Sequence, residues 1–415
     1  MSTSARQKKN TAAGVVGNVL EWYDFALFGF LAPIVSPLFF PGSDPVAGLI
    51  KTYGVFAGGY LMRPLGGIVF SYVEGLVGRA KALKIFIALM ALPTMLMGAL
   101  PTNEHIGAWA AVLLIVLRLT QGISVGGEMV GSMTSLIESA PKNRRGLAGS
   151  WSLFGASTGL LLASLVVGLL SDALSAEAMT QWGWRVAFAS GGLLFIAGLW
   201  LSPTDEPQSD QKAPQPAKAS MGEVLRTIPG RLAHISSVLL LFSAGFYTLF
   251  VWMPTYLGRI IPNPIAHAGD VNSLATVVFI IFIPLFGLLS DRVGFKPVVL
   301  TGMALFSAAI VPMFAWVDHG QFSHALIATA IMACIFAAVQ GPMAAMLVTS
   351  VPSRLRGGAM GISYNVSIGL FGGTAPLVST FLIHKTGSLA APGWYLLILG
   401  IISLVMALMF SSKST

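Results

Sequence analysis

Long apolar stretches recur along the whole chain and constrain its fold more than any other feature. Each is about 20 residues long, the length that a helix needs to cross a lipid bilayer. Hydrophobic residues make up 55% of the sequence and charged residues only 10%, far from the composition of soluble domains. The sequence therefore predicts an all-α membrane protein with twelve transmembrane helices. Their starts are expected near Gly14, Ile50, Ala82, Gly107, Gly146, Trp184, Ala233, Val271, Pro297, Phe322, Gly357 and Gly393.

The basic residues predict how the chain is oriented. Of the 24 Lys and Arg residues, 18 fall on one side of the expected membrane, 4 on the other and two inside helices. Because Lys and Arg concentrate in cytoplasmic loops, we expect a multi-pass protein of the inner (cytoplasmic) cell membrane with both termini in the cytoplasm. The formal charge of +8 is then an orientation signal, which excludes the interpretation as a nucleic-acid binder.

A polar segment divides the chain almost in half. Residues 202–220 are rich in Pro, Gln, Ser, Asp and Lys, a composition that indicates a linker. Met221, Val224, Leu225 and Ile228 then recur at helical spacing, which predicts a short amphipathic helix on the cytoplasmic surface. We therefore expect a six-helix bundle in residues 1–201, a linker with this short helix in 202–230 and a second six-helix bundle in 231–415.

The two halves resemble each other in sequence. The second and eighth apolar segments are followed by VGRAKAL and VGFKPVVL, which places Gly78 and Gly294 at equivalent positions 216 residues apart. Because each half has an even number of spans, both insert in the same orientation and are related by an axis along the membrane normal. A path between the halves is expected.

Buried charge is confined to the first half of the chain. Glu21 and Asp24 lie in the first apolar segment, three residues apart and thus on one helical face, where charge costs several kcal/mol. Arg63, Arg118 and Glu128 are the other intramembrane charges. We interpret this asymmetry as proton coupling in the first six helices, through Asp24, Arg118, Glu21 and Glu128. We expect their face to line an aqueous vestibule between the two halves.

Arg63 is the strongest candidate for substrate binding. It lies too deep, roughly 13 Å from the end of its helix, to reach water easily, and its planar, permanently charged guanidinium suits a carboxylate. The alternative is a structural ion pair with Asp24 or Glu21. Further substrate-binding candidates are polar or aromatic residues on other helices, namely Tyr23, Gln121, Trp151, Tyr247 and Asn365.

Several motifs together resemble one family. They are GNVLEWYDF in the first span, GVFAGGYLMRPLGG in the second, RLTQGISVGGE in the fourth and SYNVSIGLFGGTAP in the eleventh. The chain resembles the major facilitator superfamily, and within it the metabolite:proton symporters that import organic acids and zwitterions. The resemblance implies two six-helix bundles and alternating access between them.

The resemblance also implies gating residues in the loops after the second and eighth spans. Gly78, Arg79, Asp291 and Arg292 match the loop motif of the superfamily, whereas Gly75 replaces the acid of the first copy. In relatives that acid is thought to meet a helix N-terminus of the other half and hold the cytoplasmic side shut. The alternative is that these loops only enforce topology.

Asp24 and Arg118 resemble the acid and arginine that sugar:proton symporters of the superfamily carry on the first and fourth helices. An adjacent arginine favours the charged carboxylate, and a dry site without it favours the protonated form, so moving Arg118 captures or frees a proton. Glu128 is the competing partner of Arg118. Two arrangements that face opposite sides of the membrane would link proton entry to substrate entry.

These features favour a secondary active transporter that imports a small carboxylate or zwitterion with protons. No Walker motif or HExxH sequence is present, so an enzyme is not expected. The proton is the coupling ion, no cofactor or metal is predicted, and the partners are a small-molecule substrate and the lipid bilayer, with the chain a monomer. An uncoupled facilitator or exchanger and a transporter-derived sensor are the alternatives.

Overall fold

The structure is a computed structural model that describes residues 3–125, 128–201, 221–317 and 320–410. Within these ranges all regular elements are helices, and they are arranged as the sequence predicts. The predicted linker segment 202–220 lies outside the described residues. The all-α fold class is confirmed.

The described residues of the first half form helices in the order of six crossings, the second of which is divided between α2 and α3. The elements are α1 (Thr3–Phe39), α2 (Pro45–Leu61), α3 (Arg63–Val77), α4 (Arg79–Ala99), α5 (Asn103–Ile106), α6 (Trp109–Ser124), α7 (Glu128–Ser139), η1 (Lys142–Arg144), α8 (Arg145–Ala173), α9 (Ala176–Ala178), η2 (Met179–Gly183) and α10 (Trp184–Leu201).

The second half repeats this plan after a short helix. Its elements are α11 (Met221–Thr227), α12 (Pro229–Tyr247), η3 (Thr248–Trp252), α13 (Met253–Thr255), η4 (Tyr256–Ile260), α14 (Ala268–Val293), α15 (Phe295–Val317), α16 (Phe322–Thr349), α17 (Ser353–Ser367), η5 (Ile368–Gly372), α18 (Ala375–Thr386) and α19 (Ala391–Leu408). The segments η3, η4 and η5 are π-helical turns within the seventh and eleventh crossings.

Nine helical runs among the described residues are long and apolar enough to cross a membrane. The remaining predicted crossings are also helical. The second is divided between α2 and α3, so its helix is interrupted. The third and sixth, α4 and α10, contain residues whose side chains are not described and are not counted among the nine.

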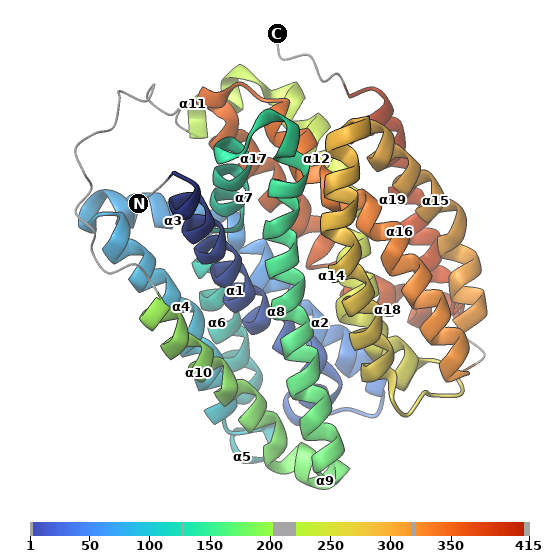
Figure 1. Ribbon diagram of the computed structural model, residues 1–415. Helices are drawn as coiled ribbons and strands as arrows, with labels where there is room; N and C mark the ends of the chain where they lie inside the picture. Colours follow the sequence, from blue (N-terminus) through green and yellow to red (C-terminus); the bar gives the residue numbers. More distant parts are fainter. Residues whose placement is uncertain (1–2, 126–127, 202–220, 318–319, 411–415) are drawn as a thin grey trace.

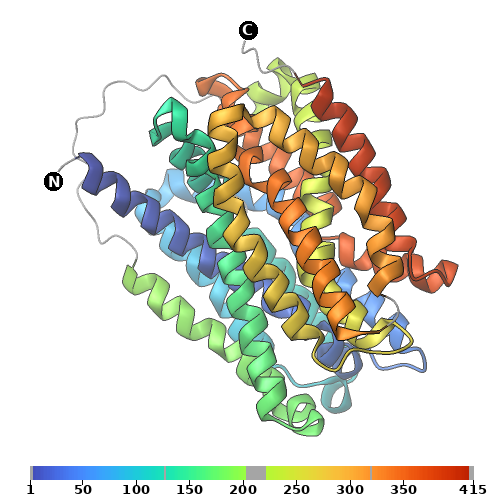
Figure 2. The ribbon, with the colours of Figure 1, turned by 45° about the vertical axis from the view of Figure 1, so that its right-hand side comes forward.

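The helices form two lobes, one from each half of the chain. Figures 1 and 2 show the blue-to-green elements α1–α10 beside the yellow-to-red elements α12–α19, with α8 against α14 in both views. A second contact between the lobes joins α2 to α18. The start of α1 and the end of α19 lie at one end of the bundle, here called the terminus face, and α5 and α9 lie at the opposite far face.

The turns at Gly78 and Gly294 have matching backbones. Gly78 has φ +80° and Gly294 has φ +96°, a region that side chains rarely adopt, and each ends its helix by donating its N–H to the carbonyl four residues earlier. Both turns lead directly into the next crossing, α4 and α15. The repeat found in the sequence is thus also a repeat in backbone geometry.

Proline breaks the second crossing at the point where Arg63 stands. Pro64 has no N–H to donate to the carbonyl of Tyr60, so α2 ends at Leu61 and α3 begins at Arg63. Gly369 of η5 packs close to the Tyr60 carbonyl from the other lobe, since a Cβ on it would lie 3.1 Å from that oxygen. The break therefore places Arg63 at the boundary between the lobes.

Candidate functional site

The centre of the molecule holds a buried ion pair at the boundary between the lobes. Arg63 donates to Glu21 at 3.1 Å, and the side chains of both residues are only 2% exposed. The Nε of Arg63 also donates to the Asn365 side-chain oxygen of α17 at 3.4 Å. One guanidinium thus joins the first two crossings to the eleventh. The ion pair with Glu21 is the alternative that the sequence left open for Arg63.

Asp24 lies in a separate network inside the first lobe. Its carboxylate accepts hydrogen bonds from the Thr94 hydroxyl of α4 at 2.8 Å and from the Gln121 amide of α6 at 3.4 Å. The Gln121 amide also donates to Thr94 at 2.7 Å, and its oxygen accepts from Arg118. The second carboxylate oxygen of Asp24 has no partner among the described residues.

The structure therefore does not form the expected Asp24–Arg118 ion pair directly. Gln121 stands between the two charges and bonds to both. Arg118 is fully buried, and its guanidinium carbon lies over the rings of Phe25 at 4.5 Å and Phe28 at 4.7 Å. Such contacts stabilise a cation by about 0.5–2 kcal/mol without using its N–H groups, and Nε and one terminal nitrogen have no acceptor among the described residues.

Two glycines hold Arg118 at this depth. A Cβ on Gly122 of α6 would lie 2.0 Å from the Gly59 carbonyl of α2, so the two helices touch backbone to backbone. A Cβ on Gly59 would lie 3.0 Å from the Arg118 Nε. The close approach of α2 and α6 leaves the Arg118 side chain only the space between the aromatic rings.

Aromatic rings from both lobes surround the central ion pair. Tyr247 of α12 lies 5.0 Å from the ring of Tyr60 and 5.9 Å from that of Trp22, and Arg63 stands 5.6 Å from the Tyr60 ring centre. The Trp22 indole N–H and the Tyr364 hydroxyl are buried with no hydrogen-bond partner among the described residues. The centre thus combines a salt bridge with aromatic ring faces and with polar groups that make no hydrogen bond among the described residues.

The other residues predicted from the sequence lie apart from this centre or outside the description. The Tyr23 hydroxyl shares a 2.5 Å hydrogen bond with Ser190 of α10, and the half-buried Trp151 packs on Phe154 of its own helix. Glu128 begins α7 and Arg79 begins α4, but their side chains lie outside the described set. Four further residues of the two central networks were not predicted from the sequence, namely Trp22, Tyr60, Thr94 and Tyr364.

Contacts between the lobes close the terminus face. Asp291, at the end of α14, accepts from the backbone N–H groups of Gly146 at 2.7 Å and Leu147 at 2.9 Å, at the start of α8. Arg356 of α17 pairs with Glu138 of α7 at 2.7 Å. Gly78 ends α3, and Arg292 beside Asp291 is exposed. A carboxylate at a helix N-terminus is favourable, so these contacts hold the two lobes together at this face.

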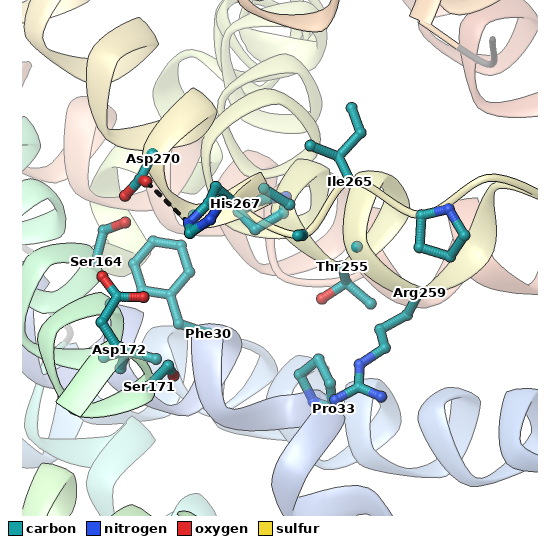
Figure 3. Close-up of a pocket in the computed structure, with 18 of the residues that line it drawn as sticks. Phe30, Pro33, Ser164, Ser171, Asp172, Thr255, Arg259, Ile265, His267 and Asp270 are labelled. Carbon is teal, nitrogen blue, oxygen red and sulfur yellow. Dashed lines mark ion pairs between the residues drawn. The ribbon is translucent and has the colours of Figure 1, made fainter. Parts of the chain in front are cut away.

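The far face is partly open. A cavity of about 390 Å³ lies between the lobes there (Figure 3), and its lining includes Thr255, whose hydroxyl accepts a 2.7 Å hydrogen bond from Tyr53 of α2. The central charges do not line this cavity. Asp24 is 3% exposed and Arg118 is fully buried, so neither side chain lines the aqueous vestibule that we expected, and the two are enclosed by the protein.

Two helical lobes that close around buried charges are the architecture of a secondary transporter. The model of the Major Facilitator Superfamily matches residues 15–261 and 263–414, and the chain belongs to this family. It is a transporter and not an enzyme, as the sequence predicts.

Relatives of the chain have names that describe transport of small solutes. The ectoine/proline transporter ProP of Corynebacterium glutamicum is 36% identical over 97% of this chain and 83% of its own length. The glycine betaine/proline/ectoine/pipecolic acid transporter OusA of Dickeya dadantii is 32% identical over 97% of this chain and 83% of its own. Among solved structures, a D-xylose-proton symporter shares the fold with a TM-score of 0.75 at 19% identity, covering 98% of this chain and 99% of that one.

Proposed function

We propose that this transporter imports a small zwitterion or carboxylate together with protons, by alternating access. The observation that carries the proposal is the pair of neighbouring buried networks in the first lobe, one around Asp24 and one around the Glu21–Arg63 ion pair. Ionisable groups at membrane depth are costly and are kept where they serve transport. One network is suited to carry a proton and the other to hold a charged substrate.

Asp24 is the proposed proton carrier. In the enclosed site a protonated Asp24 needs no counter-ion, and Arg118 rests on the aromatic rings and on Gln121. Loss of the proton creates a carboxylate that attracts Arg118, and Gln121 then has to leave the space between them. The two arrangements differ in charge and in packing, which is what coupling requires. The proton is the coupling ion, and the proposal needs no other cofactor.

The Glu21–Arg63 ion pair is the proposed substrate site. A zwitterion can insert between the two, with its carboxylate on Arg63 and its ammonium on Glu21, without changing the net charge of the centre. The ring faces of Trp22, Tyr60 and Tyr247 add cation–π attraction for the ammonium end. The relatives named for proline, betaine and ectoine carry zwitterions, which supports this choice.

The contacts of Asp291 are the proposed gate of the terminus face. With this face toward the cytoplasm, as the basic loops predict, the enclosed centre is closed to the cytoplasm and separated from the outer cavity by the Tyr53–Thr255 bond. Both termini are then cytoplasmic in a multi-pass protein of the cell membrane. Both lobes of one chain complete the enclosure, so we propose that the monomer is the working unit.

Uptake into proteoliposomes tests this function. Purified protein is reconstituted, and radiolabelled glycine betaine or proline is followed with the outside more acidic than the inside. Symport predicts accumulation above the outer concentration, which collapses when a protonophore is added. Equilibration without accumulation would refute the coupling and leave a facilitator, and binding without flux would refute transport and leave a sensor.

A further inference from the structure

The cavity at the far face takes its walls from both lobes. Phe30 and Pro33 of α1 and Asp172 of α8 lie on the first lobe, and Arg259 of η4 and His267 before α14 lie on the second. Its volume of about 390 Å³ is within the range of small-molecule sites. The space is a formed cavity at the lobe boundary and is separate from the enclosed centre.

Two oppositely charged side chains that line this cavity have no partner among the described residues. Asp270 already pairs with His267 of the same lobe at 3.4 Å. Asp172 and Arg259 line the cavity from opposite lobes, and neither has an ion-pair or hydrogen-bond partner among the described residues. Figure 3 shows the Asp172 carboxylate on the left beside Phe30 and the Arg259 guanidinium at the lower right beside Pro33. The cavity therefore has an acidic end and a basic end.

One side of the cavity between these ends is apolar. Phe30, Pro33 and Ile34 supply it from a single turn of α1. A carboxylate matches the fork of Arg259, whereas an ammonium matches Asp172 and the neighbouring ring of Phe30. A solute with one charge of either sign matches one end, whereas a zwitterion with a small apolar body matches all three parts.

We propose that this cavity is a second binding site for the zwitterionic substrate, outside the enclosed centre. The proposal rests on the function proposed above and adds to it. The outer site orients the solute with its carboxylate toward the second lobe before it passes the Tyr53–Thr255 bond. Binding there is weaker than in the centre, because both charged side chains are exposed to solvent.

Binding stoichiometry tests the outer site directly. Equilibrium dialysis of the full-length protein with radiolabelled glycine betaine is expected to give two equivalents, one tight and one weak. Arg259→Gln and Asp172→Asn each remove the weak equivalent, and Arg259→Lys, which keeps the charge, retains it. Arg63→Ala removes the tight equivalent and leaves the weak one.

Transport gives a second readout with matched controls. Arg259→Gln and Asp172→Asn are expected to raise the half-saturating concentration about two- to fivefold, the effect of one exposed charged contact, at an unchanged maximal rate. Lys385→Gln and Glu104→Gln, which neutralise far-face charges outside the cavity lining, leave both values unchanged.

The outcomes separate this proposal from the function on which it rests. Normal proton-driven uptake with a single equivalent that Arg259→Gln does not alter overturns the outer site alone. Equal competition by a simple monoanion such as acetate for the weak equivalent also overturns it. Absence of both uptake and binding overturns the transport function and the outer site together.

Discussion

Replacing Asp24 by Asn tests the proton role with the least disturbance of the fold. The amide has the shape of the carboxylic acid, and its oxygen still accepts from the Thr94 hydroxyl, which lies 2.8 Å from the carboxylate. It carries no charge at any pH, so it cannot release a proton toward Arg118. The enclosed arrangement is therefore preserved while the step that depends on proton loss is removed.

The size of the effect follows from the driving force. With the membrane potential clamped at zero, a difference of one pH unit supplies about 1.4 kcal/mol per proton, which corresponds to about tenfold accumulation of a zwitterion. We expect the wild type to approach this ratio with one proton per cycle. We expect Asp24→Asn to equilibrate the solute and stop, while exchange of internal for external solute continues, since exchange needs no net proton movement.

The assay is paired uptake and exchange in the same proteoliposome preparation. Glu104→Gln, which neutralises an acid at the far face, serves as the control and should accumulate solute as the wild type does. Full accumulation by Asp24→Asn would falsify the assignment of proton coupling to this residue. Loss of exchange as well as accumulation would also contradict it, because Asp24 would then be required for a step other than proton transfer.

Three further perturbations address the centre, the gate and the packing. Arg63→Ala removes the partner of the buried Glu21, and breaking a buried ion pair costs about 3–5 kcal/mol, so the melting temperature should fall and tight zwitterion binding should be lost. Unchanged binding would assign Arg63 to structure alone. Asp291→Asn weakens a contact worth about 1–2 kcal/mol with the start of α8, so hydrogen exchange of the Gly146 and Leu147 backbone amides should become about tenfold faster. An unchanged exchange rate would exclude the gate contact. Gly122→Ala forces a methyl group to within 2.0 Å of the Gly59 carbonyl and should lower stability by about 1–3 kcal/mol in a melting assay, whereas a wild-type melting temperature would refute the close approach.

The positions of the helices could be predicted because hydrophobic length is a local property. The predicted starts near Gly146, Trp184 and Phe322 agree within a residue or so with α8, α10 and α16. The break of the second crossing at Pro64 was also visible in the sequence, but a 20-residue apolar window averages over it. Length alone therefore gave the number of crossings and not their continuity.

The sequence left Asp24 and Glu21 both open as partners of Arg63, because the choice between them depends on how each helix is rotated. Glu21 and Asp24 are about 60° apart around their helix, which the sequence allows to be one face. That difference is enough for Glu21 to meet Arg63 at the lobe boundary while Asp24 turns into the first lobe toward Thr94. Gln121 lies three residues from Arg118, but its position between two charges needs the distances between helices.

The backbone hydrogen bond that Pro64 cannot donate has a mechanical consequence. The segment that carries Arg63 is α3, whereas Gly59, which fixes the packing against α6, belongs to α2. Bending at this joint would swing the guanidinium relative to Asn365, and α3 would have to slide along α6, because a Cβ on Gly66 of α3 would lie only 2.1 Å from the Ile123 carbonyl. In the proposed substrate site, a solute that binds the Arg63 guanidinium would therefore also pull on α3, the helix that ends at the Gly78 turn.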